Sequence, residues 1–325
     1  MIRINEQQCK TIASKLALFS HFKEKSLSPY KKIKDKRKLA NYWFFLTAIC
    51  YKTGNLKGIV NGEMLRGWDF LEAKARAILK EDPEFFLPEN LVSISSNEIA
   101  ELMLDYRDRI EQRCHLLKNC AQMLLERYKG NVMNLYYSTK GNISGQKGVL
   151  SLLSDFEAYK DPLNKKSFLL IMTLFKLGVW NFKDEEAIKL PVDNHLMRIS
   201  LRSGMLEIED IHLRGILCNQ KDIDSLLESK IRSKVLRCGD LLKKHSDMNI
   251  IQIDSLLWQI GRNCCLNSHP PFCGNHCCLS KDECSLCKAF SYRCNGLCPL
   301  DGACKASRER YYSKYFEPIS NSHYY

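Results

Sequence analysis

The stretch that decides the fold is "LPVDNHLMRISLRSGML", which runs from Leu190 to Leu206. Pro191 has a backbone angle suited to the first turn of a helix, and Asp193 can accept hydrogen bonds from the free amides of that turn. The simplest interpretation is a helix start whose acid is only a cap. The alternative is a carboxylate that is fixed at a helix N-terminus and directed at a substrate.

The sequence around this stretch is helical in pattern. Apolar residues recur at helical spacing, for example in "WDFLEAKARAILK" (68–80) and in "FLLIMTLF" (168–175). No series of alternating strands is visible, so the predicted fold class is all-α. We divide the chain into a basic N-terminal helical segment (1–38), a helical core (39–260), a cysteine-rich metal-binding region (261–310) and a tail (311–325).

The charge of the chain indicates its partner. The 49 Lys and Arg residues exceed the 37 Asp and Glu residues, which gives a formal net charge of +12. This balance favours an anionic partner such as nucleic acid. Eight of the cations lie between Lys23 and Lys38, either as a solvated helix face or as an arm that contacts phosphates. The first residues do not read as a secretory signal, and no apolar stretch is long enough to span a bilayer. We therefore expect a cytoplasmic, nucleoid-associated monomer with no membrane contact.

The cysteines are unevenly distributed. Ten of the sixteen lie between Cys264 and Cys304. In a long intracellular chain a dense local cluster of this kind is more typical of a metal site than of a disulfide framework. The sequence therefore predicts a metal centre near the C-terminus.

The segment "VDNHLMRIS" (192–200) resembles the "VDTHxxRV" stretch of the endonuclease III class of DNA glycosylases, in the helix-hairpin-helix superfamily. Val192, Asp193, His195 and Arg198 fall in register, and Asn194 replaces the family's threonine. The resemblance implies a two-lobed helical fold in which Asp193 is the catalytic carboxylate. Cleavage of an N-glycosidic bond creates positive charge on the deoxyribose, and a fixed anion stabilises that charge. A helix N-terminus favours the ionised form of such a group.

The family also carries a lysine at the end of its helical hairpin, which corresponds here to residues near 158–170. The candidates are Lys166 and, as second choice, Lys165 in "DPLNKKSFLLIMTLF" (161–175). A neutral amine there would attack the sugar and form a Schiff base, giving abasic-site lyase activity. The alternative is a phosphate contact at a helix N-terminus. "KDPLNKK" (160–166) replaces the family's "LPGVGxK", and Asp193 follows Lys166 by 27 residues. Both departures are similar to the archaeal 8-oxoguanine glycosylase branch.

Other residues are candidates for the base pocket. "FFLTAICYKTGN" (44–55) resembles the family's early "LLSAQATD" segment, where residues after a helix wedge into the gap left by an extruded base. Lys52 and Thr53 occupy the matching place. His195, Tyr51 and Trp180 would line the pocket or stack in it, or else belong to the ordinary core.

The cysteine-rich region resembles the four-cysteine [4Fe–4S] loop of endonuclease III and its adenine-excising relatives, repeated in tandem. The first quartet is Cys265, Cys273, Cys277 and Cys284, and the second is Cys287, Cys294, Cys298 and Cys304. Cys264 and Cys278 are alternates. Thiolates at these spacings can hold a cubane or a tetrahedral zinc. We expect a [4Fe–4S] cluster with a second cluster or zinc, although one cluster drawing ligands from both quartets is an alternative.

These observations predict a DNA N-glycosylase that acts on double-stranded DNA, flips a modified base and cleaves its glycosidic bond. The target is 8-oxoguanine or a hypermodified base of the kind found in phage genomes, so the biological role is DNA repair or phage defence. Two alternatives remain. One is a non-enzymatic, metal-stapled DNA-binding protein, and the other is a glycosylase that acts on nucleotides or RNA.

Overall fold

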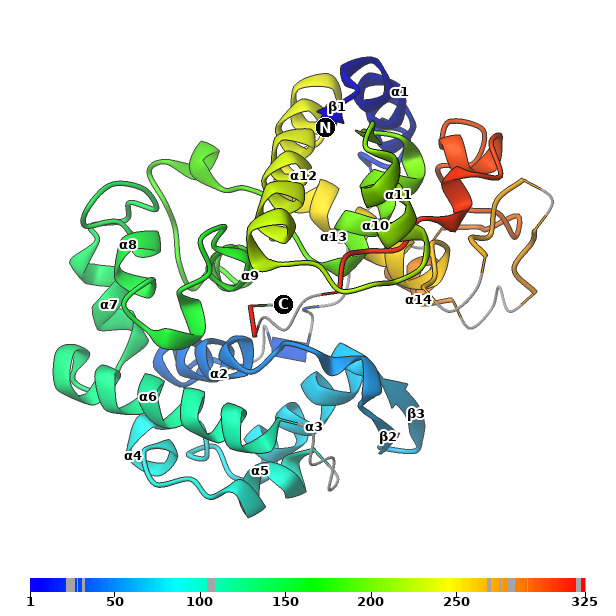
Figure 1. The fold of residues 1–325 in the computed structure, drawn as a ribbon. Coiled ribbons are helices and arrows are strands. Elements are labelled where there is room, and N and C mark those ends of the chain that lie inside the picture. The colour runs from blue at the N-terminus through cyan, green and yellow to red at the C-terminus, as the bar shows by residue number, and fades with distance from the viewer. Residues whose placement is uncertain are drawn as a thin grey trace. The chain divides into compact units, whose positions relative to one another are not determined.

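The computed structural model describes the chain except for residues 22–26, 28, 31–32, 104–108, 268–269, 275, 280–283, 291, 320–322 and 325. Four lysines of the predicted basic arm lie outside the described residues, namely Lys23, Lys25, Lys31 and Lys32. The described chain is mostly helical (Figure 1), which confirms the predicted all-α class.

The chain forms two compact units that are not contiguous in sequence. Unit 1 contains Met1–Leu27 and Lys189–Ser322, and unit 2 contains Ser28–Ile188 and His323–Tyr325. The division at Lys189 falls inside the segment that we assigned to one helical core. Unit 1 therefore joins the N-terminal helix to the Asp193 segment and the cysteine-rich region.

Unit 1 is built around α10. Its helices are α1 (Glu6–Ala17), α10 (Asn194–Ser203), α11 (Ile211–Cys218), α12 (Ser225–His245), α13 (Ile250–Asn263) and α14 (Ser285–Phe290), with short 3-10 turns η5 (Lys305–Ser307) and η6 (Tyr312–Lys314). Every residue from Leu196 to Ser203 is buried, because α12, α13, η5 and η6 all pack against this short helix. Burial of its apolar side chains, such as Leu196 and Leu201, contributes to the stability of this unit.

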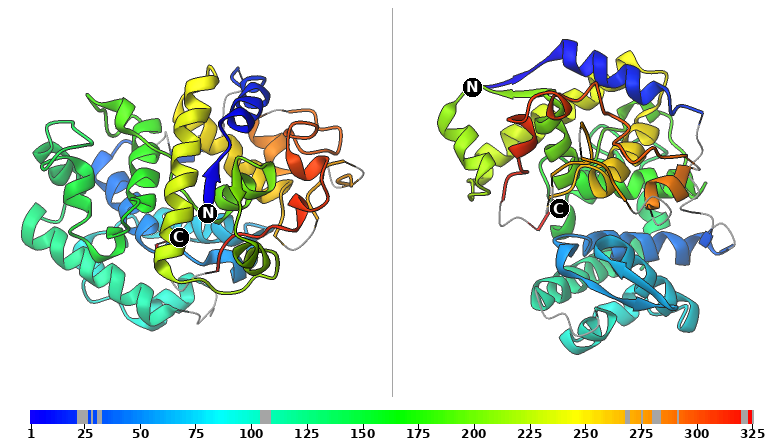
Figure 2. Two further views of the ribbon diagram at one scale, coloured as in Figure 1. Left: turned by 45° about the horizontal axis from the view of Figure 1, so that its top comes forward. Right: turned by 90° about the vertical axis from the view of Figure 1, so that its right-hand side faces the viewer.

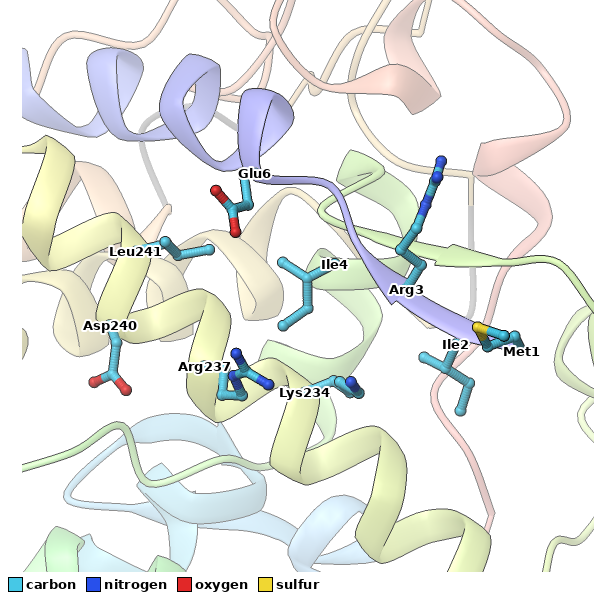
Figure 3. Close-up of a pocket in the computed structure, with 9 residues that line it drawn as sticks. All are labelled: Met1, Ile2, Arg3, Ile4, Glu6, Lys234, Arg237, Asp240 and Leu241. Carbon is cyan, nitrogen blue, oxygen red and sulfur yellow. The ribbon is translucent and has the colours of Figure 1, made fainter.

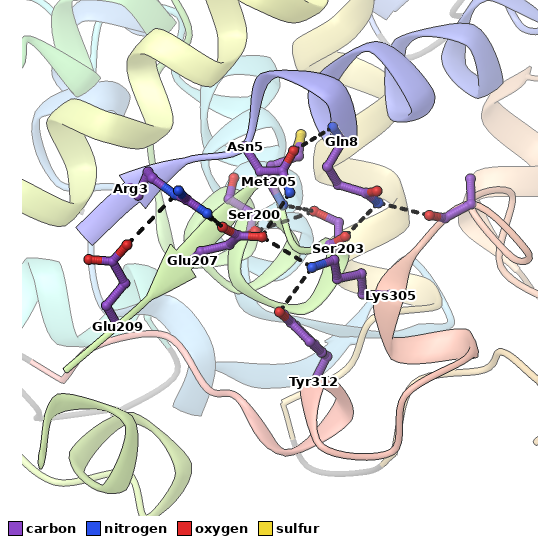
Figure 4. Close-up of polar contacts among 11 residues, drawn as sticks. Arg3, Asn5, Gln8, Ser200, Ser203, Met205, Glu207, Glu209, Lys305 and Tyr312 are labelled. Carbon is purple, nitrogen blue, oxygen red and sulfur yellow. Dashed lines mark hydrogen bonds and ion pairs between the residues drawn. The ribbon is translucent and has the colours of Figure 1, made fainter. Parts of the chain in front are cut away.

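A two-stranded sheet fastens the N-terminus to the end of α10 (Figure 2). Strand β1 (Ile2–Ile4) pairs antiparallel with β4 (Leu206–Ile208). Glu207 on β4 accepts hydrogen bonds from Arg3, Asn5 and Lys305 (Figure 4). Burial alone would raise the pKa of Glu207, but these donors hold it near 2. The ionised carboxylate therefore links three distant segments of the chain.

Unit 2 contains α2 (Lys36–Ala48), α3 (Gly67–Glu81), α4 (Pro88–Leu91), α5 (Ser96–Leu102), α6 (Ile110–Tyr128), α7 (Val132–Ser138), α8 (Val149–Leu153) and α9 (Lys165–Lys176), with 3-10 turns η2 (Thr53–Asn55), η3 (Glu157–Tyr159) and η4 (Glu185–Ala187). Helix α2 begins at the Asp35 cap and is buried from Leu39 to Ala48. This burial explains why its sequence is apolar almost all round.

Unit 2 also contains a β-hairpin that the sequence analysis did not predict. Strand β2 (Lys57–Val60) pairs antiparallel with β3 (Glu63–Arg66) through the two-residue turn Asn61-Gly62. Both turn residues have positive φ, +52° and +84°, as a type I′ turn requires.

Candidate active site and cysteine-rich region

Asp193 is the N-cap of α10. Its backbone is extended, and its Oδ1 accepts a hydrogen bond of 3.1 Å from the amide of Leu196. Pro191 and Val192 before it are buried, whereas Asp193 itself is half-buried. The capping bond uses one of the two carboxylate oxygens. The two interpretations of Asp193 are therefore compatible, because the same group can cap the helix and face a reacting sugar.

His195 lies one residue inside α10 and is fixed by its neighbours. Its Nδ1 lies 2.9 Å from Nη2 of Arg198, which can only donate, so the ring proton of neutral His195 belongs on Nε2. Burial, together with the charges of Arg198 and Arg262, lowers the pKa of His195. The ring packs edge-to-face on Trp258 of α13 at 6.0 Å. A Cβ at Gly261 would lie 2.6 Å from the His195 Cβ, so this close approach of α10 and α13 requires glycine.

Two buried arginines connect α10 to the cysteine-rich region. Arg198 donates to the carbonyls of Cys265 and Gly261 and forms an ion pair of 2.7 Å with Glu317. Arg202, one turn later, donates to the carbonyls of Tyr315 and Leu266. Because each guanidinium bridges several backbone carbonyls, the position of α10 depends on the path of the chain after α13.

Four cysteines line one small cavity of about 10 Å³ beside Arg202. They are Cys265, Cys273, Cys298 and Cys304. Two belong to each of the predicted quartets, so the chain interleaves the quartets instead of stacking them in tandem. The guanidinium Nη1 of Arg202 lies 3.6 Å from Cys265 Sγ, and the amide of Leu300 lies 3.4 Å from Cys298 Sγ. Such donors favour thiolates, but burial and the neighbouring thiols raise the pKa of Cys273 and Cys304.

Three other cysteines form a second group, in which Cys284 and Cys294 hydrogen-bond to Cys287. Burial, followed by the charges of these two thiols, raises the pKa of Cys287 to about 12. The two alternate ligands, Cys264 and Cys278, have different partners. Cys264 hydrogen-bonds to Cys298, and the amide of Cys278 donates to the Gly296 carbonyl. Cys277 is exposed.

The sulfur atoms of these cysteines are suitable ligands for iron or zinc. Their side chains, however, are not positioned to coordinate a metal ion. Within the described residues no group of three or more histidine, cysteine, aspartate or glutamate side chains is placed so that it could hold a metal ion. The cavity of about 10 Å³ is also too small for a cubane. Metal binding would therefore require the cysteine side chains to move.

The predicted lysines begin α9 in unit 2. Lys166 is fully buried, donates to the Ala48 carbonyl at 2.6 Å and lies 4.7 Å above the Tyr51 ring. Burial, helped by the charges of Lys165 and Arg113, lowers the pKa of Lys166 to about 7. Lys165 is also buried, and its Nζ lies 3.8 Å from Cys50 Sγ. Because the amine is buried, the Lys166 side chain would have to move before it could contact either a phosphate or a sugar.

The turn before α9 differs from a glycine-rich hairpin. The buried carboxylate of Asp161 accepts hydrogen bonds from the amides of Leu163 and Lys165, at 3.1 and 2.8 Å. Asp161 is a buried site residue that was not predicted from the sequence. The signal was present, because an aspartate that precedes a helix start by a few residues often binds the amides that follow it.

The remaining pocket candidates lie in unit 2 in different settings. Tyr51 is buried beneath Arg113 and Lys166 and donates to Gln112. Trp180 is fully buried and stacks on Tyr136 at 5.3 Å, which is an ordinary core position. Lys52 has a left-handed backbone (φ +48°) and is half-buried, as is Thr53.

Unit 1 also contains an open cavity of about 450 Å³ (Figure 3). It is bounded by β1, the start of α1 and α12, and its charged lining includes Arg3, Lys234, Arg237 and Asp240. None of the predicted site residues lines it.

Comparison with known proteins supports the class that the resemblance implied, a DNA glycosylase of the helix-hairpin-helix superfamily. Residues 171–281 match the family model described as AGOG, N-glycosylase/DNA lyase. The match contains α10 and Asp193 and extends into the cysteine-rich region. No curated protein matches the chain. In the described part of the chain, no helix is long and apolar enough to cross a membrane.

Proposed function

We propose that the protein excises a modified base from duplex DNA, with Asp193 as the catalytic carboxylate. The observation that carries this proposal is the position of Asp193, which is fixed at the start of a buried helix yet half-exposed. The bond between the sugar C1′ and the base nitrogen breaks, and the base leaves with the electron pair and takes up a proton. Asp193 stabilises the positive charge that develops on the sugar.

We further propose that Lys166 is the nucleophile of a lyase step. With its pKa lowered to about 7, a large fraction of the amine is neutral at physiological pH. The nitrogen attacks C1′ as the base departs, the sugar ring opens, and a protonated Schiff base forms. Loss of a C2′ proton then expels the 3′ phosphate, and water releases the amine. The hydrogen bond from Lys166 to Ala48 must break before attack.

We propose an oxidised purine such as 8-oxoguanine as the target, on the basis of the sequence resemblance to the archaeal branch, with a hypermodified base as the second candidate. Excision of an oxidised purine would make the protein a repair enzyme, and excision of a hypermodified base would make it a defence enzyme against phage DNA. The test is incubation of the wild-type protein with DNA carrying each modification, followed by mass spectrometry of the released bases. We expect one class of modified base to be released. If no DNA yields a free base while binding persists, the protein is a DNA-binding module and the proposal fails.

We also propose that the cysteine-rich region holds a metal centre, a [4Fe–4S] cluster or zinc, through Cys265, Cys273, Cys298 and Cys304. Support comes from the gathering of these four thiols and from the N–H donors near Cys265 and Cys298, and the side chains would have to move to admit the metal. A bound metal would stabilise the segment after α13, to which Arg198 and Arg202 donate hydrogen bonds. This follows because the free energy of metal binding adds to the folding stability.

Metal content tests this assignment. Protein purified without oxygen should contain iron and sulfide, or zinc, and Cys265→Ser and Cys298→Ser should lose the same metal. Cys277→Ser should retain it, because Cys277 is exposed. Cys120→Ala, in the core of unit 2, is the control for loss of a buried thiol. Loss of metal in Cys277→Ser would contradict the proposed ligand set and favour the first tandem quartet, in which Cys277 is a ligand.

A further inference from the structure

The β2–β3 hairpin presents one face that the fold does not use. Lys57 pairs with Arg66 and Ile59 pairs with Met64, so these four side chains share a face. All four are exposed, with exposed fractions of 64% for Ile59 and 59% for Met64. The other face carries Val60, which is buried. The hairpin packs against α3, which follows it in the chain (Figure 1).

The exposed face has two chemical zones. Lys57 and Arg66 form a cationic pair at the end where the strands join α3 and η2, and Ile59 and Met64 form an apolar pair beside the turn. The acid of the hairpin, Glu63, pairs with Val60 and so points to the opposite face. Cations beside exposed apolar side chains are suited to a partner that carries negative charge next to an apolar surface.

Duplex DNA is such a partner. Its phosphates bind cations, and its base steps accept apolar wedges from proteins that unstack them. A two-stranded ribbon is also narrow enough to enter a groove. The type I′ turn makes the ribbon short and rigid, because a two-residue loop fixes the strand register.

We propose that this hairpin face, Lys57, Ile59, Met64 and Arg66, is a DNA-contacting ribbon, an inference that rests on the proposed function. Lys57 and Arg66 contact backbone phosphates, and Ile59 and Met64 press against a base step and unstack it near the target nucleotide.

The test separates the two zones by their salt dependence. Binding of a duplex containing 2-aminopurine is measured across a range of salt concentrations. Lys57→Ser with Arg66→Ser should reduce the slope of log affinity against log salt by about 2, since each phosphate contact contributes about 0.9. Ile59→Ser with Met64→Ser should leave the slope unchanged, weaken binding about tenfold and abolish the rise in 2-aminopurine fluorescence that reports unstacking.

Matched control pairs are available elsewhere on the surface. Lys80→Ser with Lys147→Ser removes two exposed cations of unit 2, and Ile211→Ser with Leu226→Ser removes two exposed apolar side chains of unit 1. Thermal unfolding of each variant checks its fold. Hairpin variants that behave like the controls, in a protein that still releases base, would overturn the inference alone. A wild type that releases no base but shows the predicted slopes would overturn the enzymatic proposal and leave the DNA-contacting ribbon in place.

Discussion

The N-termini of α10 and α9 carry the two proposed chemical groups in opposite environments. At α10 an acid caps the helix, is half-exposed and makes a hydrogen bond of 3.1 Å to Leu196. At α9 the first two residues are buried lysines, and the acid that binds the amide of Lys165 is Asp161. A carboxylate at a helix N-terminus is favourable in water, whereas an ammonium buried there is not.

The two helix N-termini therefore differ in their effect on stability. The Asp193 carboxylate stabilises its helix, whereas burial of the Lys166 ammonium destabilises the fold. Asp193 caps its helix as aspartates commonly do, and the capping bond uses only one of the two oxygens of its half-exposed carboxylate. Lys166 is instead costly to bury in its charged form, and its lowered pKa is a direct consequence. Such a cost is typical of functional sites, where environments shift pKa values toward the working pH.

The largest expected effect is on covalent trapping at α9. Borohydride should trap a DNA adduct with the wild type, and Lys166→Met should reduce trapping to background because the amine is gone. The methionine variant should be at least as stable as the wild type, since it removes a buried amine. Lys165→Met is the matched control and should still be trapped. Trapping through Lys165 alone would reverse the assignment of the two lysines.

The attachment of α10 gives the next effect. Arg198→Ala leaves Glu317 buried without its cation, which should cost about 3–5 kcal/mol in urea unfolding. The ion pair Arg127–Asp155 is exposed and serves as the control, so Arg127→Ala should change the free energy of unfolding by less than about 1 kcal/mol. Equal losses in the two variants would show that the buried ion pair does not anchor the helix.

The pH dependence of trapping is the smallest of these effects. Because the pKa of Lys166 is lowered to about 7, the neutral amine increases as pH rises and is nearly complete above that value. Trapping under single-turnover conditions should therefore rise about tenfold per pH unit below the pKa of about 7 and level off above it. A rate that continues to rise toward pH 10 would indicate an ordinary, solvated lysine.

Much of this arrangement follows from local sequence. The start of α10 could be predicted because proline, aspartate and an apolar helical repeat are contiguous, and the buried α9 because its apolar run is unbroken. The β2–β3 hairpin also had a local signal, the Asn61-Gly62 pair between alternating residues, which we overlooked among helical patterns.

Other features depend on the path of the chain and could not be predicted from spacing. The pairing of β1 with β4 joins residues about 200 positions apart. Cys265 and Cys304 share a cavity because the chain after α13 folds back on Arg202, so the quartets interleave. Trp180 was a pocket candidate from residue type alone, and only the packing on Tyr136 shows that it is a core residue.

The most direct test of the central claim compares two capping aspartates. Asp210 caps α11 with a hydrogen bond of 2.9 Å to Leu213, much as Asp193 caps α10. Asparagine caps helices about as well, so Asp193→Asn and Asp210→Asn should both unfold close to the wild-type temperature. Single-turnover base release should fall by about 10²–10³ in Asp193→Asn and stay at the wild-type rate in Asp210→Asn. Equal rates in the two variants would contradict the catalytic role of Asp193.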